Sequence, residues 1–110
     1  MKWIIILFFL GCTIPLTAQH TDHIQEAMAN YDYETALSLI AQKKTTPPLL
    51  LQKGKALRGL GLTTEALSTY EEIISNDTTN ARAFIEAAEC CRALAKYNQA
   101  LNYYEHALDL

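Results

Sequence analysis

From residue 22 onward, apolar residues recur along the chain at spacings of three and four, and no stretch alternates as a half-buried strand would. This period is typical of amphipathic helices. Caps and helix breakers divide the pattern into six helices, expected near residues 22–30, 33–43, 48–60, 64–75, 81–94 and 97–110. The sequence therefore predicts an all-α fold with short connections.

Several helix ends have a clear chemical signature. Thr46 before Pro47 supplies an N-cap followed by a proline at the first helical position. The stretch Gly-Leu-Gly-Leu-Thr at 59–63 supplies a C-cap and a turn, after which Thr63 is expected to cap the next helix. Polar residues at 76–80 and a tight segment at 95–98 complete the turns. Short helices joined this way call for a search for internal repeats.

A shift of 34 residues aligns 47–76 with 81–110. The identical pairs are Arg58 with Arg92, Leu60 with Leu94, Ala66 with Ala100, Leu67 with Leu101, Tyr70 with Tyr104 and Glu71 with Glu105. An earlier, looser copy contains Ala36, Leu37 and Ile40, but it precedes the next repeat by 30 residues instead of 34. The connection through residues 43–46 is therefore expected to be abbreviated.

This pattern resembles the tetratricopeptide repeat, a 34-residue helix-turn-helix unit with small residues where helices approach and aromatic residues four positions after an alanine. The matching core positions are Gly54, Ala66, Tyr70, Ala88, Ala100 and Tyr104. The resemblance implies a helical solenoid of antiparallel helix pairs, with repeats at 47–80 and 81–110 and a degenerate first pair at 21–46. It also implies that Leu67 and Leu101 belong to the repeat core.

The second clear repeat stops at Leu110 without the polar capping helix that a terminal repeat usually carries. We interpret this as a truncated repeat, and self-association through the uncapped repeat is the alternative.

The first 18 residues form a different unit. Lys2, an apolar run at 3–10 and small residues up to Ala18 are typical of a secretory signal peptide, and the run is too short for a membrane-spanning helix. The alternatives are lipidation at Cys12, because residues 9–12 resemble a bacterial lipobox, and an uncleaved membrane anchor. Export would permit disulfides, yet the mature chain would keep only the adjacent Cys90 and Cys91, which we expect to remain thiols in a helix.

The composition excludes several function classes. A formal charge of −3 and no basic tract longer than two lysines argue against nucleic acid as a partner. The His-Thr-Asp-His stretch at 20–23 has too few ligands for a tetrahedral metal site, and Cys90-Cys91 lacks the spacing of a redox motif. With no phosphate-binding loop and no nucleophile elbow, we expect no enzyme, no cofactor and no metal.

The family resemblance implies that the first helices of successive repeats line a concave groove that binds a protein or peptide segment. The matching positions are Leu51, Lys55, Arg58, Arg82, Ile85, Glu89 and Arg92. Their cations suit an acidic or carboxylate-ended peptide above an apolar floor, although Glu89 opposes this.

The expected function is therefore an exported interaction scaffold in the periplasm or cell envelope, with membrane contact only through the signal or a lipid anchor. The alternatives are a lipid-anchored outer-membrane assembly or uptake factor, and the N-terminal accessory part of a longer envelope enzyme.

Overall fold

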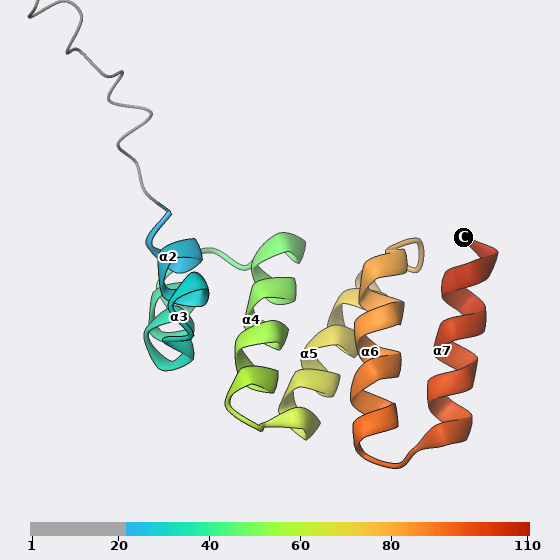
Figure 1. Ribbon diagram of the computed structural model, residues 1–110. Coiled ribbons are helices and arrows are strands. Elements are labelled where there is room, and N and C mark those ends of the chain that lie inside the picture. Colours follow the sequence, from blue (N-terminus) through green and yellow to red (C-terminus); the bar gives the residue numbers. More distant parts are fainter. Residues whose placement is uncertain (1–21) are drawn as a thin grey trace, which may run out of the picture.

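The computed structural model describes residues 22–110, in which six helices follow one another with short turns and no strand (Figure 1). They are α2 (His23–Ala29), α3 (Tyr33–Ala41), α4 (Pro47–Gly59), α5 (Thr63–Asn76), α6 (Ala81–Ala93) and α7 (Tyr97–Asp109). Each end lies within two residues of the sequence prediction, so the all-α fold is confirmed. The predicted signal peptide and Cys12 lie outside the described residues.

None of the helices described has both the length and the apolar character that a membrane crossing requires.

Side-chain caps explain where most helices begin. The capping residues, each accepting a backbone N–H bond from the first turn, are Asp22, Asp32, Thr46 and Asn80. The expected cap at Thr63 is wrong, because Thr63 is itself the first residue of α5 and Leu62 before it makes no side-chain bond. Gly61, at φ +78°, closes the preceding turn while the Leu62 N–H bonds to the Leu57 carbonyl. Three residues, Leu60, Gly61 and Leu62, are left between the two helices.

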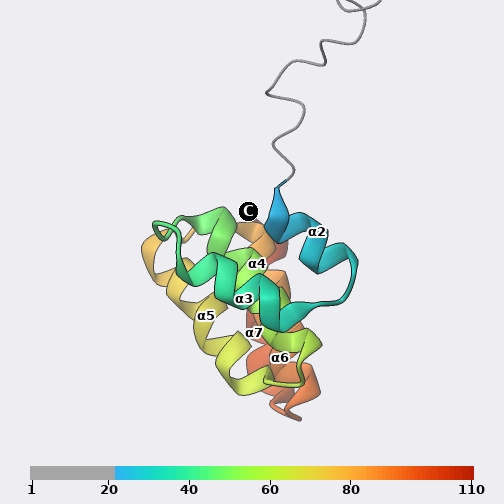
Figure 2. The same ribbon diagram turned by 90° about the vertical axis from the view of Figure 1, so that its left-hand side faces the viewer.

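The helices stack in a single row, and each packs mainly against its neighbours in sequence. Figure 1 shows the row from α2 to α7, and Figure 2 looks along it with α2 and α3 towards the viewer. Alternate helices are also tied together, because the Tyr103 hydroxyl of α7 donates to Glu71 of α5 at 2.8 Å. The result is a solenoid of helix pairs.

The main core lies between α4, α5 and α6 and is centred on Tyr70, which is completely buried. Its ring rests against Gly54 of α4 so closely that a Cβ atom at Gly54 would stand 2.4 Å from Tyr70 Cζ. Ala66, Ala88 and Ala100 are also buried. Small residues therefore stand where the aromatic ring or a neighbouring helix needs the space.

The last helix departs from the predicted core. Leu101 is 57% exposed although its counterpart Leu67 is 5% exposed, so its assignment to the core is wrong. Tyr104 is half-buried where Tyr70 is fully buried. The physical reason is the same for both: α6 covers this side of α5, and no helix among the described residues covers the corresponding side of α7.

Candidate functional site

The first helices of the successive pairs, α2, α4 and α6, contribute side chains to one surface, here named the first-helix face. Residues of α2 and α4 line a hollow of about 300 Å³ in it, namely Gln25, Met28, Ala29, Gln52 and Lys55. Farther along, Arg58 of α4 reaches across to α6. This face is where the sequence predicted a groove.

The predicted groove residues occupy this face at different depths. Lys55, Arg82 and Arg92 are exposed, and Ile85 is 41% exposed. Leu51 is half-buried and packs against the main core, so it forms part of the floor. Apolar and cationic groups therefore share one surface.

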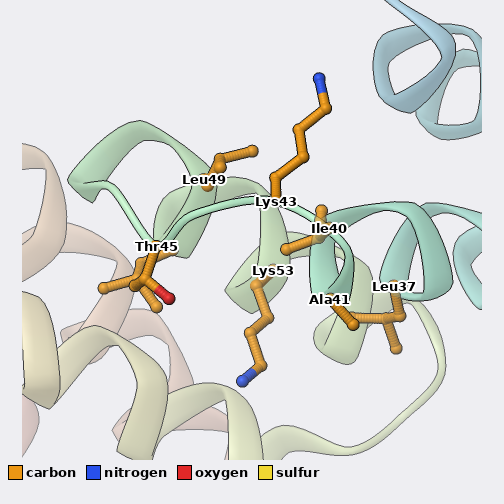
Figure 3. A pocket seen from close by; sticks show the side chains of 8 residues that line it. Leu37, Ile40, Ala41, Lys43, Thr45, Leu49 and Lys53 are labelled. Carbon is orange, nitrogen blue, oxygen red and sulfur yellow. The ribbon is translucent and has the colours of Figure 1, made fainter.

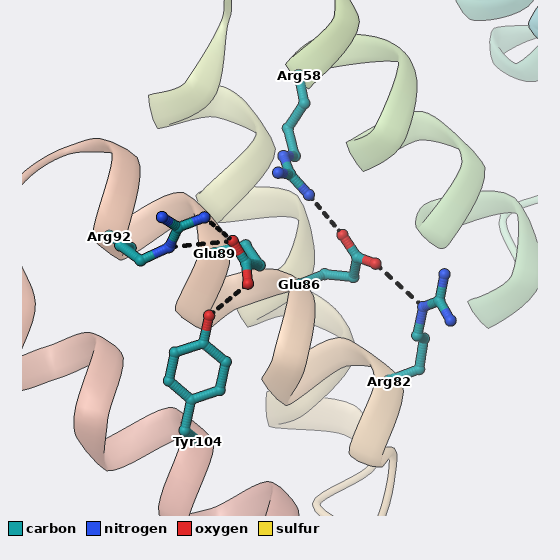
Figure 4. A network of polar contacts seen from close by, with 6 residues as sticks. All are labelled: Arg58, Arg82, Glu86, Glu89, Arg92 and Tyr104. Atoms are coloured by element: carbon teal, nitrogen blue, oxygen red, sulfur yellow. Dashed lines mark hydrogen bonds and ion pairs between the residues drawn. The ribbon is translucent and has the colours of Figure 1, made fainter.

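A carboxylate that the sequence analysis did not single out organises the arginines. Glu86 of α6 accepts a hydrogen bond from Arg58 Nη1 at 2.6 Å and another from Arg82 Nε at 3.0 Å (Figure 4). The Glu86 side chain is only 18% exposed. The spacing of Arg82 and Glu86 at i and i+4 on one helix is the sequence signal that would have revealed this pair. The longer link to Arg58 needs the fold.

Glu89, the predicted groove residue of opposite charge, is engaged rather than free. It accepts hydrogen bonds from Arg92 Nη2 at 2.6 Å and from the Tyr104 hydroxyl of α7 (Figure 4). The hydrogen bonds from Tyr104 and Arg92 lower the pKa of the Glu89 carboxyl. The carboxylate is therefore ionised at neutral pH and links the middle of α7 to α6.

The charges named on this face do not balance. Four cations, Lys55, Arg58, Arg82 and Arg92, stand beside two carboxylates, Glu86 and Glu89. Arg58 and Arg82 share a single carboxylate, and Arg82 keeps a 70% exposed side chain. The first-helix face therefore has an excess of positive charge that an acidic group can complement.

Three buried side chains, Tyr70, Cys90 and Cys91, keep their polar groups away from the surface. The Tyr70 hydroxyl has no hydrogen-bond partner among residues 22–110, and burial raises the pKa of the Tyr70 phenol. Cys90 and Cys91 are free thiols, both fully buried, and burial raises the pKa of Cys90 to about 11. A thiol with so high a pKa is a poor nucleophile.

No metal site is found within residues 22–110: no three side chains of His, Cys, Asp or Glu are grouped there as ligands. His23 is exposed beside Glu26, with His20 outside the described residues. The His106 ring stacks on Phe84 and its Nδ1 lies 2.8 Å from the Asn102 carbonyl oxygen. Both described histidines thus have ordinary surface contacts.

Comparisons with known proteins agree with this architecture. The family model described as tetratricopeptide repeat matches residues 47–80 and 81–110, more than half of the chain. A search of the curated proteins finds no match. Among solved structures, PcrH in complex with the chaperone binding region of PopB aligns with a TM-score of 0.74 and 20% identity. The alignment covers 88% of this chain and 82% of that one, and at this identity it shows a shared fold.

Proposed function

Because the chain belongs to the tetratricopeptide-repeat family, we propose that it binds an extended segment of a partner protein along its first-helix face. Repeats of this family and a fold neighbour that holds a partner's segment support a protein interaction scaffold. The partner contact proposed here involves α4 and α6 above all. No catalytic step is part of the proposal.

One observation carries the proposal: Ile85, a large aliphatic side chain, is 41% exposed on the same surface as an excess of cations. Arg58 and Arg82 lie nearby, with one carboxylate between them. A partner segment that combines an apolar side chain with acidic groups would match both features, since it covers the isoleucine and supplies the missing negative charge.

Binding would require little rearrangement of the scaffold. The ion pairs already hold Arg58 in place across α4 and α6, and the helices are packed before any partner arrives. Preorganisation of this kind lowers the entropy cost of association. An incoming carboxylate would engage Arg82, the more exposed arginine, while Glu86 keeps its bond to Arg58.

The proposed setting is the periplasm or the cell envelope. This part of the proposal rests on the N-terminal sequence, in which one lysine, an apolar run and small residues precede the helices. Intact mass measured on the protein from soluble and membrane fractions of the native host tests it. A soluble species beginning at Gln19 supports export, whereas an acylated species beginning at Cys12 supports the lipoprotein alternative.

A photo-crosslinking amino acid at Ile85 tests the binding face in the native host. The matched control carries the same crosslinker at Leu62, which is 42% exposed but lies in the turn between α4 and α5. The expected result is that one partner peptide, identified by mass spectrometry, crosslinks at Ile85 and not at Leu62. Equal crosslinking at both positions, or none at Ile85, would contradict the proposal.

A further inference from the structure

A second hollow lies on the other side of α4, at its junction with α3. It has a volume of about 110 Å³ and an apolar floor formed by Leu37, Ile40, Leu49 and Leu50. Lys43 and Lys53 stand at its edge, and Figure 3 shows their ammonium groups pointing to opposite sides. Residues two apart on a helix point about 200° apart, so Lys53 faces away from Lys55 and the first-helix face.

The hollow exists because the first helix pair is abbreviated. α3 has 9 residues, whereas α5, its counterpart in the next pair, has 14. Aligning Ala36 with Ala66 places Lys43 where α5 has Ile73, and the 34-residue shift places Lys53 where α6 has Ala87. Ile73 and Ala87 are buried together in the main core. The junction that is sealed between α5 and α6 is thus open between α3 and α4.

The two lysines give the opening a positive edge. Within residues 22–110, neither Lys43 nor Lys53 takes part in an ion pair. Lys53 is half-buried, so its methylene groups line the wall while its ammonium group reaches solvent. An apolar hollow between two unpaired cations is complementary to an apolar group between two anions.

We propose that this hollow, here named the α3–α4 pocket, is a second docking site that accepts one aliphatic side chain of an acidic peptide segment. The size fits such a group: a cavity of roughly 150 Å³ accommodates benzene, so one of 110 Å³ accepts a smaller branched aliphatic side chain. Carboxylates on both sides of the aliphatic residue pair with Lys43 and Lys53. The site lies opposite the first-helix face and does not depend on it.

Fluorescence anisotropy with a defined probe tests this site on the whole 110-residue chain. The probe is a labelled peptide with blocked ends, in which one leucine is flanked by two glutamates on its N-terminal side and two on its C-terminal side. With the ends blocked, the charge of the peptide comes only from its side chains. Replacing its leucine by alanine is expected to weaken binding by roughly 15- to 60-fold, the loss for about two to three buried carbon atoms. This comparison leaves the protein unchanged and so does not depend on the folding of any variant.

Two double variants with the same change in charge separate the pocket from general attraction. Lys43→Gln with Lys53→Gln removes both pocket lysines and is expected to weaken binding of the leucine probe by roughly tenfold, as for two partly exposed ion pairs. Lys44→Gln with Lys96→Gln removes two exposed lysines that line neither the pocket nor the hollow of the first-helix face, and binding should change less than about twofold.

The outcomes are decisive in both directions. Equal weakening by the two double variants, no dependence on the leucine, or no binding of the probe would overturn the site. Concentration-dependent dimerisation of the wild type that the pocket variant abolishes would place a second copy there and also overturn it. Crosslinking at Ile85 is measured separately, so failure of the α3–α4 pocket and failure of the first-helix face are distinguishable.

Discussion

Replacement of Gly54 by alanine tests the packing that holds the repeats together. Gly54 lies inside α4, where glycine is intrinsically unfavourable, so alanine would normally stabilise the helix by about 1 kcal/mol. Here the added Cβ would stand 2.4 Å from Cζ and 2.5 Å from Cε1 of Tyr70. Ordinary carbon contacts lie near 3.5–4.0 Å, so the overlap is roughly 1 Å.

The overlap should outweigh the gain in helix propensity. Tyr70 has no exposed surface and is enclosed by α4 and α6, so its ring cannot turn aside. Overpacking of a filled core costs typically about 1–3 kcal/mol, and an overlap of this size belongs at the upper end. Subtracting the helix gain leaves a net destabilisation of about 2 kcal/mol. For a folded unit of this size, that is a fall in Tm of roughly 8–16 °C.

Urea denaturation followed by circular dichroism measures the loss in the free energy of unfolding. Introducing Gly54→Ala into a Tyr70→Leu variant as well identifies the cause of the loss. In Tyr70→Leu the ring is absent, so Gly54→Ala should there be neutral or stabilising. The next repeat has the same pair of positions, with Ala88 in place of Gly54 and Tyr104 in place of Tyr70. The alanine is tolerated there because Tyr104 is only half-buried and its ring is free to lean outward. An unchanged or raised stability of Gly54→Ala, or the same loss in both backgrounds, would refute the reasoning.

Three further predictions follow from the buried and bridging groups. Tyr70→Phe removes a buried hydroxyl without a partner, so the free energy of unfolding in urea should be unchanged or rise by about 1 kcal/mol, and a clear loss would contradict this. The hydrogen bonds that lower the pKa of Glu89 stabilise the folded protein at pH values above the ordinary carboxyl pKa. This stabilisation disappears as the pH falls through the lowered pKa. Tyr104→Phe should therefore lose less stability than wild type between about pH 7 and pH 3, measured by thermal melting; an equal loss in both would refute the coupling. Cys90 and Cys91 are buried, and the pKa of Cys90 is about 11, so both thiols should be unreactive towards a thiol reagent in the native protein. Both should react once the protein is unfolded in urea, and rapid labelling of the native protein would contradict their burial.

The fold was predictable from local chemistry. The caps at Thr46 and Asn80 and the left-handed Gly61 mark helix ends, and the 34-residue period identifies the repeat. Leu101 was assigned wrongly because repeat identity says which residues are equivalent, but burial depends on the neighbour that covers them. The same sequence position is closed in α5 and open in α7.

The site was predictable only in outline. Family resemblance pointed to Arg58 and Arg82, yet it did not reveal that Glu86 holds both, because the link from α4 to α6 crosses 28 residues of sequence. The α3–α4 pocket could not be predicted from the sequence either. An abbreviated connection was expected, but only the packing of α3 on α4 shows that Lys43 and Lys53 border a hollow.

The central claim is that a partner segment lies along the first-helix face, and NMR shift mapping tests it most directly. The segment identified by crosslinking is titrated into isotope-labelled protein while backbone and methyl signals are followed. The account predicts that the largest changes cluster at Lys55, Arg58 and Ile85, on α4 and α6. Changes confined to the outer side of α7, around the exposed Leu101 and Leu108, would contradict it.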